Sequence, residues 1–278
     1  MLTYCYLPNK LLLHIMNTTL ITIIGFTIIF AMTTLGASVV YMFKKDISHR
    51  ANAIFLGFAA GIMIAASVWS LIIPSIEQSK ASYGSLAWLP SAIGIIIGGL
   101  FLVFLDKVVP HFHIQTNEEE GPNINMHKTT KLFLAITIHN IPEGLAVGFA
   151  FGGAAVIGTD AAFISALGLA IGIAIQNFPE GAAVSLPMNT LIKNKNKSFL
   201  FGMASGAVEP VCAILGYFMA SQIIGIQHWL LAFSAGAMLF VVAEDLIPSA
   251  NLNENTHWGT WGILLGFVLM MILDIALE

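Results

Sequence analysis

The sequence predicts an all-α polytopic membrane protein with eight transmembrane helices. Three observations support this prediction. Of the 278 residues, 57% are hydrophobic and only 9% are charged, whereas a soluble domain carries about 25% charged residues. The apolar residues gather into eight stretches, each long enough for the about 20 residues that a spanning helix needs. The few basic residues fall mostly in alternate connections between these stretches.

The eight stretches are expected to be helices, because an isolated strand cannot satisfy its backbone hydrogen bonds in lipid. They cover residues 18–43, 52–76, 86–109, 131–157, 161–189, 198–223, 228–250 and 257–277. Together they form a transporter-like membrane domain over residues 18–278, preceded by a short segment, residues 1–17, that is expected outside the cytoplasm.

The basic residues predict how the helices are oriented. Nine of the eleven Lys and Arg residues lie in, or within three residues of, the connections from the first stretch to the second, the third to the fourth, and the fifth to the sixth. Only Lys10 and Lys80 fall on the other side. Because cytoplasmic loops of membrane proteins carry an excess of Lys and Arg, we predict that both termini are non-cytoplasmic.

Two connections are informative about the arrangement. The longest hydrophilic one, residues 110–130, contains histidines, an acidic run and the turn signal Gly121-Pro122, and is predicted to be a mobile cytoplasmic loop. The connection between the fourth and fifth stretches is only a few residues long. These two helices are therefore expected to be antiparallel neighbours.

Two near-copies of one short motif interrupt the fourth and fifth stretches. Residues 139–144 read HNIPEG and residues 176–181 read QNFPEG. A charge at the centre of a membrane costs about 2.5–3.5 kcal/mol on insertion scales. Two matched copies therefore indicate a site built from facing helices. A third carboxylate, Glu209, lies within the sixth stretch and is also followed by a proline.

Helical geometry brings the polar residues of each motif together. At about 100° per residue, Glu143 points between the directions of His139 and Asn140, one turn further along. The same relation holds in the second motif. Pro142 and Pro179 each leave one backbone carbonyl without its helical partner, and broken helices are a recurring device for binding ions inside membranes. The pattern predicts two neighbouring cation sites with the glutamates between them.

The donor types favour a borderline divalent metal such as zinc, iron or manganese. The cluster offers one imidazole, three carboxylates and several amides without a pair of cysteines, whereas copper(I) prefers sulfur ligands. The alternative interpretation is that the amides and protonated glutamates only hold the helices together.

The chain resembles the ZIP family of metal transporters (zinc- and iron-regulated transporter-like proteins), in its prokaryotic-type branch, over nearly its whole length. Besides the two motifs, the resemblance rests on LDKVVPHFH at residues 105–113, AAS at 65–67 with LIIP at 71–74, and AEDLIP at 243–248. It implies eight helices, both termini outside, and an elevator-like motion of the first, fourth, fifth and sixth helices against the others.

The resemblance also implies a binuclear metal centre on the fourth, fifth and sixth helices. One site would use His139, Glu143, Gln176 and Glu180, and the second would use Asn140, Glu143, Asn177, Glu180 and Glu209. Some members carry Asp where this chain has Asn177, so the second site here holds one negative charge less.

Further polar or sulfur-bearing residues are candidates for the path of the metal. Each also has a simpler interpretation, such as packing for a buried Met or a solvated loop for the histidines. The candidates are Met63, Ser67, Asp106, His111, His113 and Glu244.

We therefore expect an integral protein of the cytoplasmic membrane that imports Zn²⁺, with Fe²⁺, Mn²⁺ and Cd²⁺ as alternative substrates. No phosphate-binding loop of the Gly-x-x-x-x-Gly-Lys-Ser/Thr type is present, so ATP hydrolysis is not expected. Neither nucleotide nor nucleic acid is an expected partner, and no enzyme activity or enzyme cofactor is expected. A homodimer is expected only because the resemblance to the family implies one. The alternatives are an intramembrane metal-dependent hydrolase that activates water and a metal sensor without flux.

Overall fold

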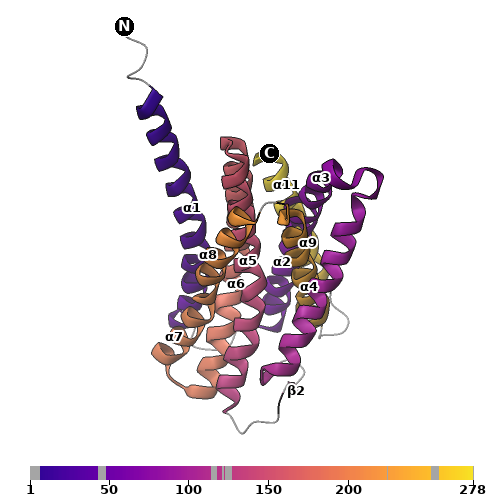
Figure 1. Ribbon diagram of the computed structural model, residues 1–278. Helices are drawn as coiled ribbons and strands as arrows, with labels where there is room; N and C mark the ends of the chain where they lie inside the picture. Colours follow the sequence, from indigo (N-terminus) through magenta and orange to yellow (C-terminus); the bar gives the residue numbers. More distant parts are fainter. Residues whose placement is uncertain are drawn as a thin grey trace.

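The computed structural model shows a bundle of long helices (Figure 1). It describes residues 7–42, 48–113, 118–120, 122, 127–223, 225–251 and 257–277. Within these residues, eight helices are long and apolar enough to cross a membrane: Asn17–Tyr41, Arg50–Leu86, Trp88–Val108, Thr129–Ile157, Asp160–Ile192, Lys195–Gln222, Gln227–Ala250 and Trp258–Ala276. Each coincides with one of the predicted stretches, so the predicted fold class is confirmed.

Several spans are composed of more than one helical element. The α-helices are α1 (Leu7–Ala37), α2 (His49–Ala66), α3 (Ile73–Tyr83), α4 (Trp88–Val108), α5 (Lys128–Ile157), α6 (Asp160–Ile192), α7 (Lys195–Gly206), α8 (Val208–Gln222), α9 (Gln227–Val241), α10 (Ile247–Asn251) and α11 (Trp258–Leu277). Two wider, π-helical turns, η2 (Ser67–Ile72) and η4 (Val242–Leu246), join α2 to α3 and α9 to α10.

The second span is longer than predicted. It continues through Pro74 to Leu86, about ten residues beyond the predicted end at residue 76. A proline lacks the N–H that the preceding turn needs, but Pro74 lies in the first turn of α3, directly after the π-helical turn η2. The helix therefore continues into a more polar segment that hydropathy alone does not reveal.

The long connection between the third and fourth spans contains two short strands that were not predicted. Strand β1 (His111–His113) pairs antiparallel with β2 (Glu118–Glu120), and α5 begins a few residues later. The rest of this connection lies largely outside the described residues. The side chains of His111 and His113 also lie outside the description, so their predicted role stays a prediction.

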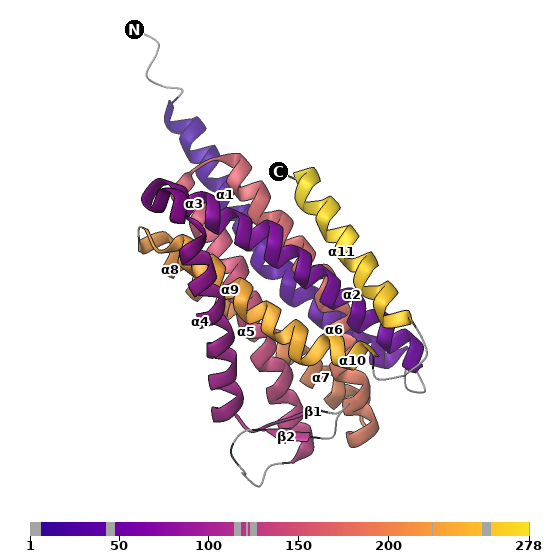
Figure 2. The ribbon, with the colours of Figure 1, turned by 90° about the vertical axis from the view of Figure 1, so that its right-hand side faces the viewer.

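The helices pack in four close pairs, α1 on α6, α5 on α8, α2 on α11 and α4 on α9; the pair of α2 and α11 is visible in Figure 2. Glycines allow the contact between backbones. A Cβ on Gly144 of α5 would lie 2.4 Å from the carbonyl oxygen of Glu209, and one on Gly61 of α2 would lie 2.0 Å from that of Ile263. Any side chain at these positions would force the helices apart.

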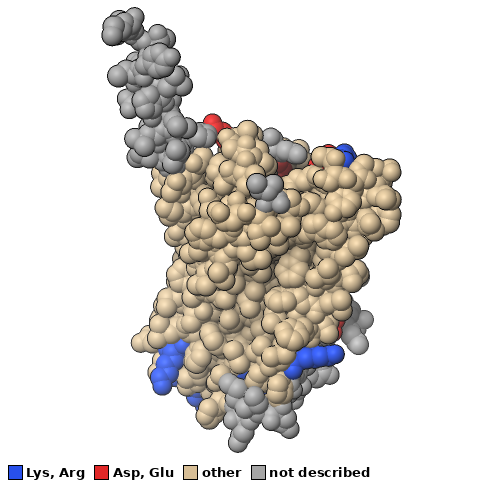
Figure 3. Space-filling model, in the orientation of Figure 1, with Lys and Arg blue, Asp and Glu red and all other residues tan. Residues whose placement is uncertain are grey.

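The two ends of the bundle differ in charge. The described start of α1 and end of α11 lie at the same end (Figure 1). Lys and Arg side chains gather mainly at the opposite end of the face shown in Figure 3. This distribution agrees with the predicted orientation, which itself stays a prediction.

Candidate metal centre

The two repeated motifs lie in the middle of α5 and α6, which contact each other. Both helices run on through Pro142 and Pro179 without interruption. The expectation of broken helices was therefore wrong. Each proline removes a single hydrogen bond, and the surrounding bundle holds the rest of the helix in place.

Most of the predicted ligands are withdrawn from the surface. The exposed fraction is 1% or less for Asn140, Glu143, Gln176, Asn177 and Glu209. Glu180 and His139 are partly buried. A buried carboxylate is costly unless it is protonated, hydrogen-bonded or bound to a cation, so the partners of the three glutamates decide what this cluster can do.

The amide of Gln176 lies between two of the carboxylates. Its Nε2 donates to Glu143 Oε1 at 2.5 Å and to Glu180 Oε1 at 3.3 Å. The bond to Glu143 joins α6 to α5 at the level of both motifs, and the bond to Glu180 lies within α6. Three of the four side chains predicted to form the first site, Glu143, Gln176 and Glu180, are therefore in contact, with an N–H group at the position between the carboxylates.

The third carboxylate is held by two donors. Asn177 Nδ2 donates to Glu209 Oε2 at 2.5 Å, and Thr33 Oγ1 donates to Glu209 Oε1 at 2.9 Å. Thr33 lies on α1 and was not predicted. The first span contains several threonines, and nothing in their spacing separates Thr33 from the others.

Three oxygens of this cluster are buried and have no hydrogen-bond partner among the described residues. They are Asn140 Oδ1, Glu143 Oε2 and Gln176 Oε1. Leaving a buried acceptor unsatisfied costs about 1–3 kcal/mol. Asn140 is fixed because its Nδ2 donates to the Ser205 carbonyl at 3.0 Å. Amide and carboxylate oxygens suit divalent cations, so the cluster is chemically suited to bind one.

His139 turns toward a different part of the bundle. Its Nε2 lies 3.1 Å from Asp245 Oδ2, in the π-helical turn η4. The sequence points to both Glu244 and Asp245 as gate or interface candidates. Glu244 is exposed and Asp245 is partly buried, since a helix turned by an extra residue changes which side chain faces inward.

The other candidate path residues are spread over the bundle. Met63 and Ser67 are fully buried on the second span, and Ser67 Oγ has no hydrogen-bond partner in the described part of the chain. Asp106 is partly buried near the end of α4. No described hydrogen bond joins any of these three to the glutamates. Across the described residues, no three His, Cys, Asp or Glu side chains stand together as a group that could hold a metal, so a site here needs the amide oxygens.

Comparison with known proteins agrees with this chemistry. The family model for ZIP zinc transporters matches residues 117–274. Zinc transporter ZIP11 from Homo sapiens is 33% identical, over 92% of this chain and 96% of that protein. Zinc transporter GufA from Myxococcus xanthus is 34% identical, over 88% and 94%. Zinc transporter ZupT from Stenotrophomonas maltophilia is 28% identical, over 92% and 95%. With its eight membrane-spanning helices, the chain belongs to the ZIP zinc transporter family.

Proposed function

We propose that this protein carries Zn²⁺ across the cytoplasmic membrane into the cell through the cluster on α5, α6 and α8. The observation that carries the proposal is a set of three buried oxygens, one of them from Glu143, that have no hydrogen-bond partner among the described residues. They lie in the middle of membrane-spanning helices. Relatives named zinc transporters support the choice of metal. Carboxylate and amide ligands also suit Mn²⁺ and Fe²⁺, and we include these ions and Cd²⁺ as secondary substrates.

We assign His139, Glu143, Gln176 and Glu180 to the first metal position. An amide binds a cation through its oxygen, whereas the Gln176 nitrogen now faces the carboxylates. Loading the site therefore requires the Gln176 amide to turn. Within the described part of the chain Oε1 accepts no hydrogen bond, so on the side of the glutamates the movement gives up only the bonds that Nε2 donates to them.

The second metal position comprises Asn140, Glu143, Asn177, Glu180 and Glu209. Here both carboxylate oxygens of Glu209 already accept hydrogen bonds, and Asn177 supplies no charge. We therefore expect the second position to fill after the first and to bind zinc less tightly.

Transport would follow a sliding motion of one helix set, α1, α5, α6 and α7–α8, against α2–α3, α4, α9–α10 and α11. The closest backbone contacts, made at glycines, lie within each set. One contact between the sets is made by the flexible side chain of Met270, which meets Gly172 of α6. Thioethers adapt readily to new neighbours, and sliding of packed helices is a known form of domain motion.

Uptake of radiolabelled zinc into sealed vesicles containing the purified protein tests the function. We expect uptake above that of protein-free vesicles, abolished by EDTA and by Glu143→Gln. A peptide-cleavage assay on the same preparation tests for the rival hydrolase. Zinc binding without uptake would support a sensor and would contradict the proposal.

A further inference from the structure

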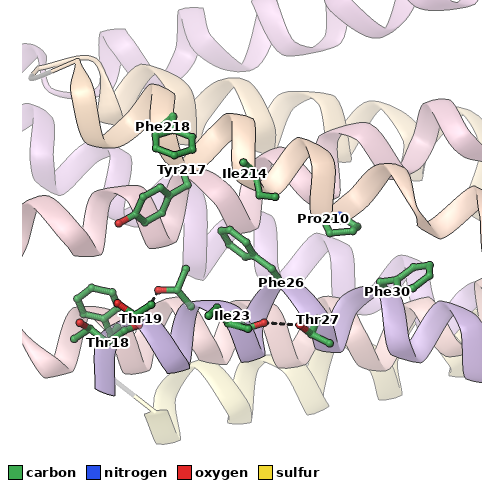
Figure 4. A pocket seen from close by; sticks show the side chains of 12 residues that line it. Thr18, Thr19, Ile23, Phe26, Thr27, Phe30, Pro210, Ile214, Tyr217 and Phe218 are labelled. Carbon is green, nitrogen blue, oxygen red and sulfur yellow. Dashed lines mark hydrogen bonds between the residues drawn. The ribbon is translucent and has the colours of Figure 1, made fainter. Parts of the chain in front are cut away.

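A groove of about 520 Å³ runs along the outside of the bundle between α1 and α8 (Figure 4). Seven residues of α1, four of α8 and Phe163 of α6 line it. Its rim opens outward, because Ile23, Ile214 and Phe218 are 48–57% exposed. In a membrane-spanning bundle, this rim faces the surrounding lipid. The volume falls within the range of about 300–1,000 Å³ that is usual for small-molecule sites.

The length and position of the groove match one leaflet of a bilayer. It extends along α1 from Thr18 to Phe30, which at a rise of 1.5 Å per residue corresponds to about 18 Å. The first candidate span begins at Asn17. Because the hydrocarbon core is about 30 Å thick, the groove reaches from the membrane interface to about the middle of the bilayer.

The lining is mostly apolar, and two of its four threonines add little polarity. The hydroxyls of Thr22 and Thr27 donate to carbonyl oxygens of their own helix, at 2.9 and 2.7 Å. A hydroxyl that is bound in this way leaves mainly its methyl group for a ligand. Deeper in the groove, Phe26 packs edge-on against Tyr217 with ring centres 6.3 Å apart. These surfaces suit a hydrocarbon chain and offer little to water.

We propose that the groove binds one acyl chain of a membrane phospholipid from the leaflet in which α1 begins. The occupant follows from the position: an outward-facing apolar channel of this length lies alongside lipid chains that run in the same direction. The inner end of the groove is formed by Pro210, which directly follows Glu209. A bound chain would therefore pack against the turn of α8 that holds the third carboxylate.

Native mass spectrometry of the purified protein tests the proposal, with palmitoyl-oleoyl phosphatidylglycerol as the probe. Ile214→Trp and Thr22→Phe would each fill the groove. Ile272→Trp is the matched control, because Ile272 is 53% exposed on α11, away from the groove. We expect the tightest phospholipid to bind at least about tenfold more weakly to both groove variants, a loss of about 1.4 kcal/mol, and unchanged binding to the control.

Lipid binding by either folded groove variant that equals the wild type would overturn the proposal. Two groove variants are used so that failure of one to reach the membrane leaves the other to decide. A shift from dimer to monomer without a change in lipid binding would also overturn it, since the groove would then be a contact between two copies of this chain. None of these readouts depends on zinc transport.

Discussion

The two copies of the motif, HNIPEG in α5 and QNFPEG in α6, are nearly identical in sequence and differ in what they contact. Asn140 in the first copy donates to a backbone carbonyl, that of Ser205. Its counterpart Asn177 donates to the carboxylate of Glu209 and to the Ile29 carbonyl. The reason is the neighbouring helix: α5 packs mainly against the sixth span at α8, whereas α6 packs mainly against α1.

The first residues of the two copies differ in the same way. His139 reaches Asp245 in the other helix set, whereas Gln176 reaches the two glutamates within its own set. Local sequence thus placed six donors at one depth in the membrane. Which donor faces a metal, a backbone or another helix depends on contacts between distant segments.

The largest effect is expected from the glutamates that the two copies share. Mutating a residue that only hydrogen-bonds to a metal ligand usually costs roughly 10–100-fold. Glu143→Gln should reduce zinc uptake by more than this, because it removes a carboxylate proposed for both metal positions. Glu180→Gln should act in the same direction but less strongly, since Glu180 is only partly buried.

Uptake rates measured in vesicles with equal amounts of protein check this order. The control is Glu77→Gln, which changes an exposed carboxylate on α3 that pairs with Lys80 and should leave uptake unchanged. A folded Glu143→Gln protein with wild-type uptake would refute the shared role.

A second prediction concerns the two hydrogen bonds that Glu209 accepts, one on each carboxylate oxygen, from Thr33 and Asn177. At Glu143, only one carboxylate oxygen accepts a hydrogen bond from the described residues. Thr33→Val keeps the shape of the side chain but removes the hydroxyl that donates to Glu209. We expect zinc affinity at the second position to fall by about 10–100-fold, and Thr33→Ser to restore most of it.

Isothermal titration with zinc would measure both sites of these two variants. Wild-type affinity in Thr33→Val with a loss in Thr33→Ser would mean that the threonine methyl, and hence packing, is what matters.

The two asparagines should respond differently to the same substitution. Asn177→Asp adds a carboxylate beside Glu209, so we expect tighter zinc binding. Uptake should be equal or slower, because a more tightly bound ion dissociates more slowly. Asn140→Asp would set an acceptor against the Ser205 carbonyl, and should mainly lower thermal stability. Titration, flux and thermal unfolding of both variants would separate the two roles; weaker zinc binding in Asn177→Asp would show that Asn177 does not face the metal.

The smallest effect is expected outside the membrane. Deleting residues Thr116 to Met126 removes no residue of the cluster, and loops tolerate such changes well. Uptake should slow without being lost. Complete loss in a deletion variant that still reaches the membrane would place this segment in the transport path.

Sequence reasoning reached the spans and the two motifs because both are local signals. Hydropathy marks a span, and the short connection at Gly158 forces α5 and α6 together. It did not reach Thr33 or the pairing of Asp245 with His139, because in both cases the partners lie far apart in the chain. The extension of the second span was missed for a related reason. Hydropathy marks no span over the polar residues that follow Ile76, and the contacts of α3 with α4 and α9 support the helix there.

The most direct test of the metal centre is anomalous scattering from crystals of this protein soaked in zinc. The account predicts a strong peak among Glu143, Gln176 and Glu180, with the Gln176 amide turned so that its oxygen faces the metal. A weaker peak should lie beside Glu209. Zinc found only elsewhere in the bundle, with the hydrogen bond from Gln176 to Glu143 intact, would contradict it.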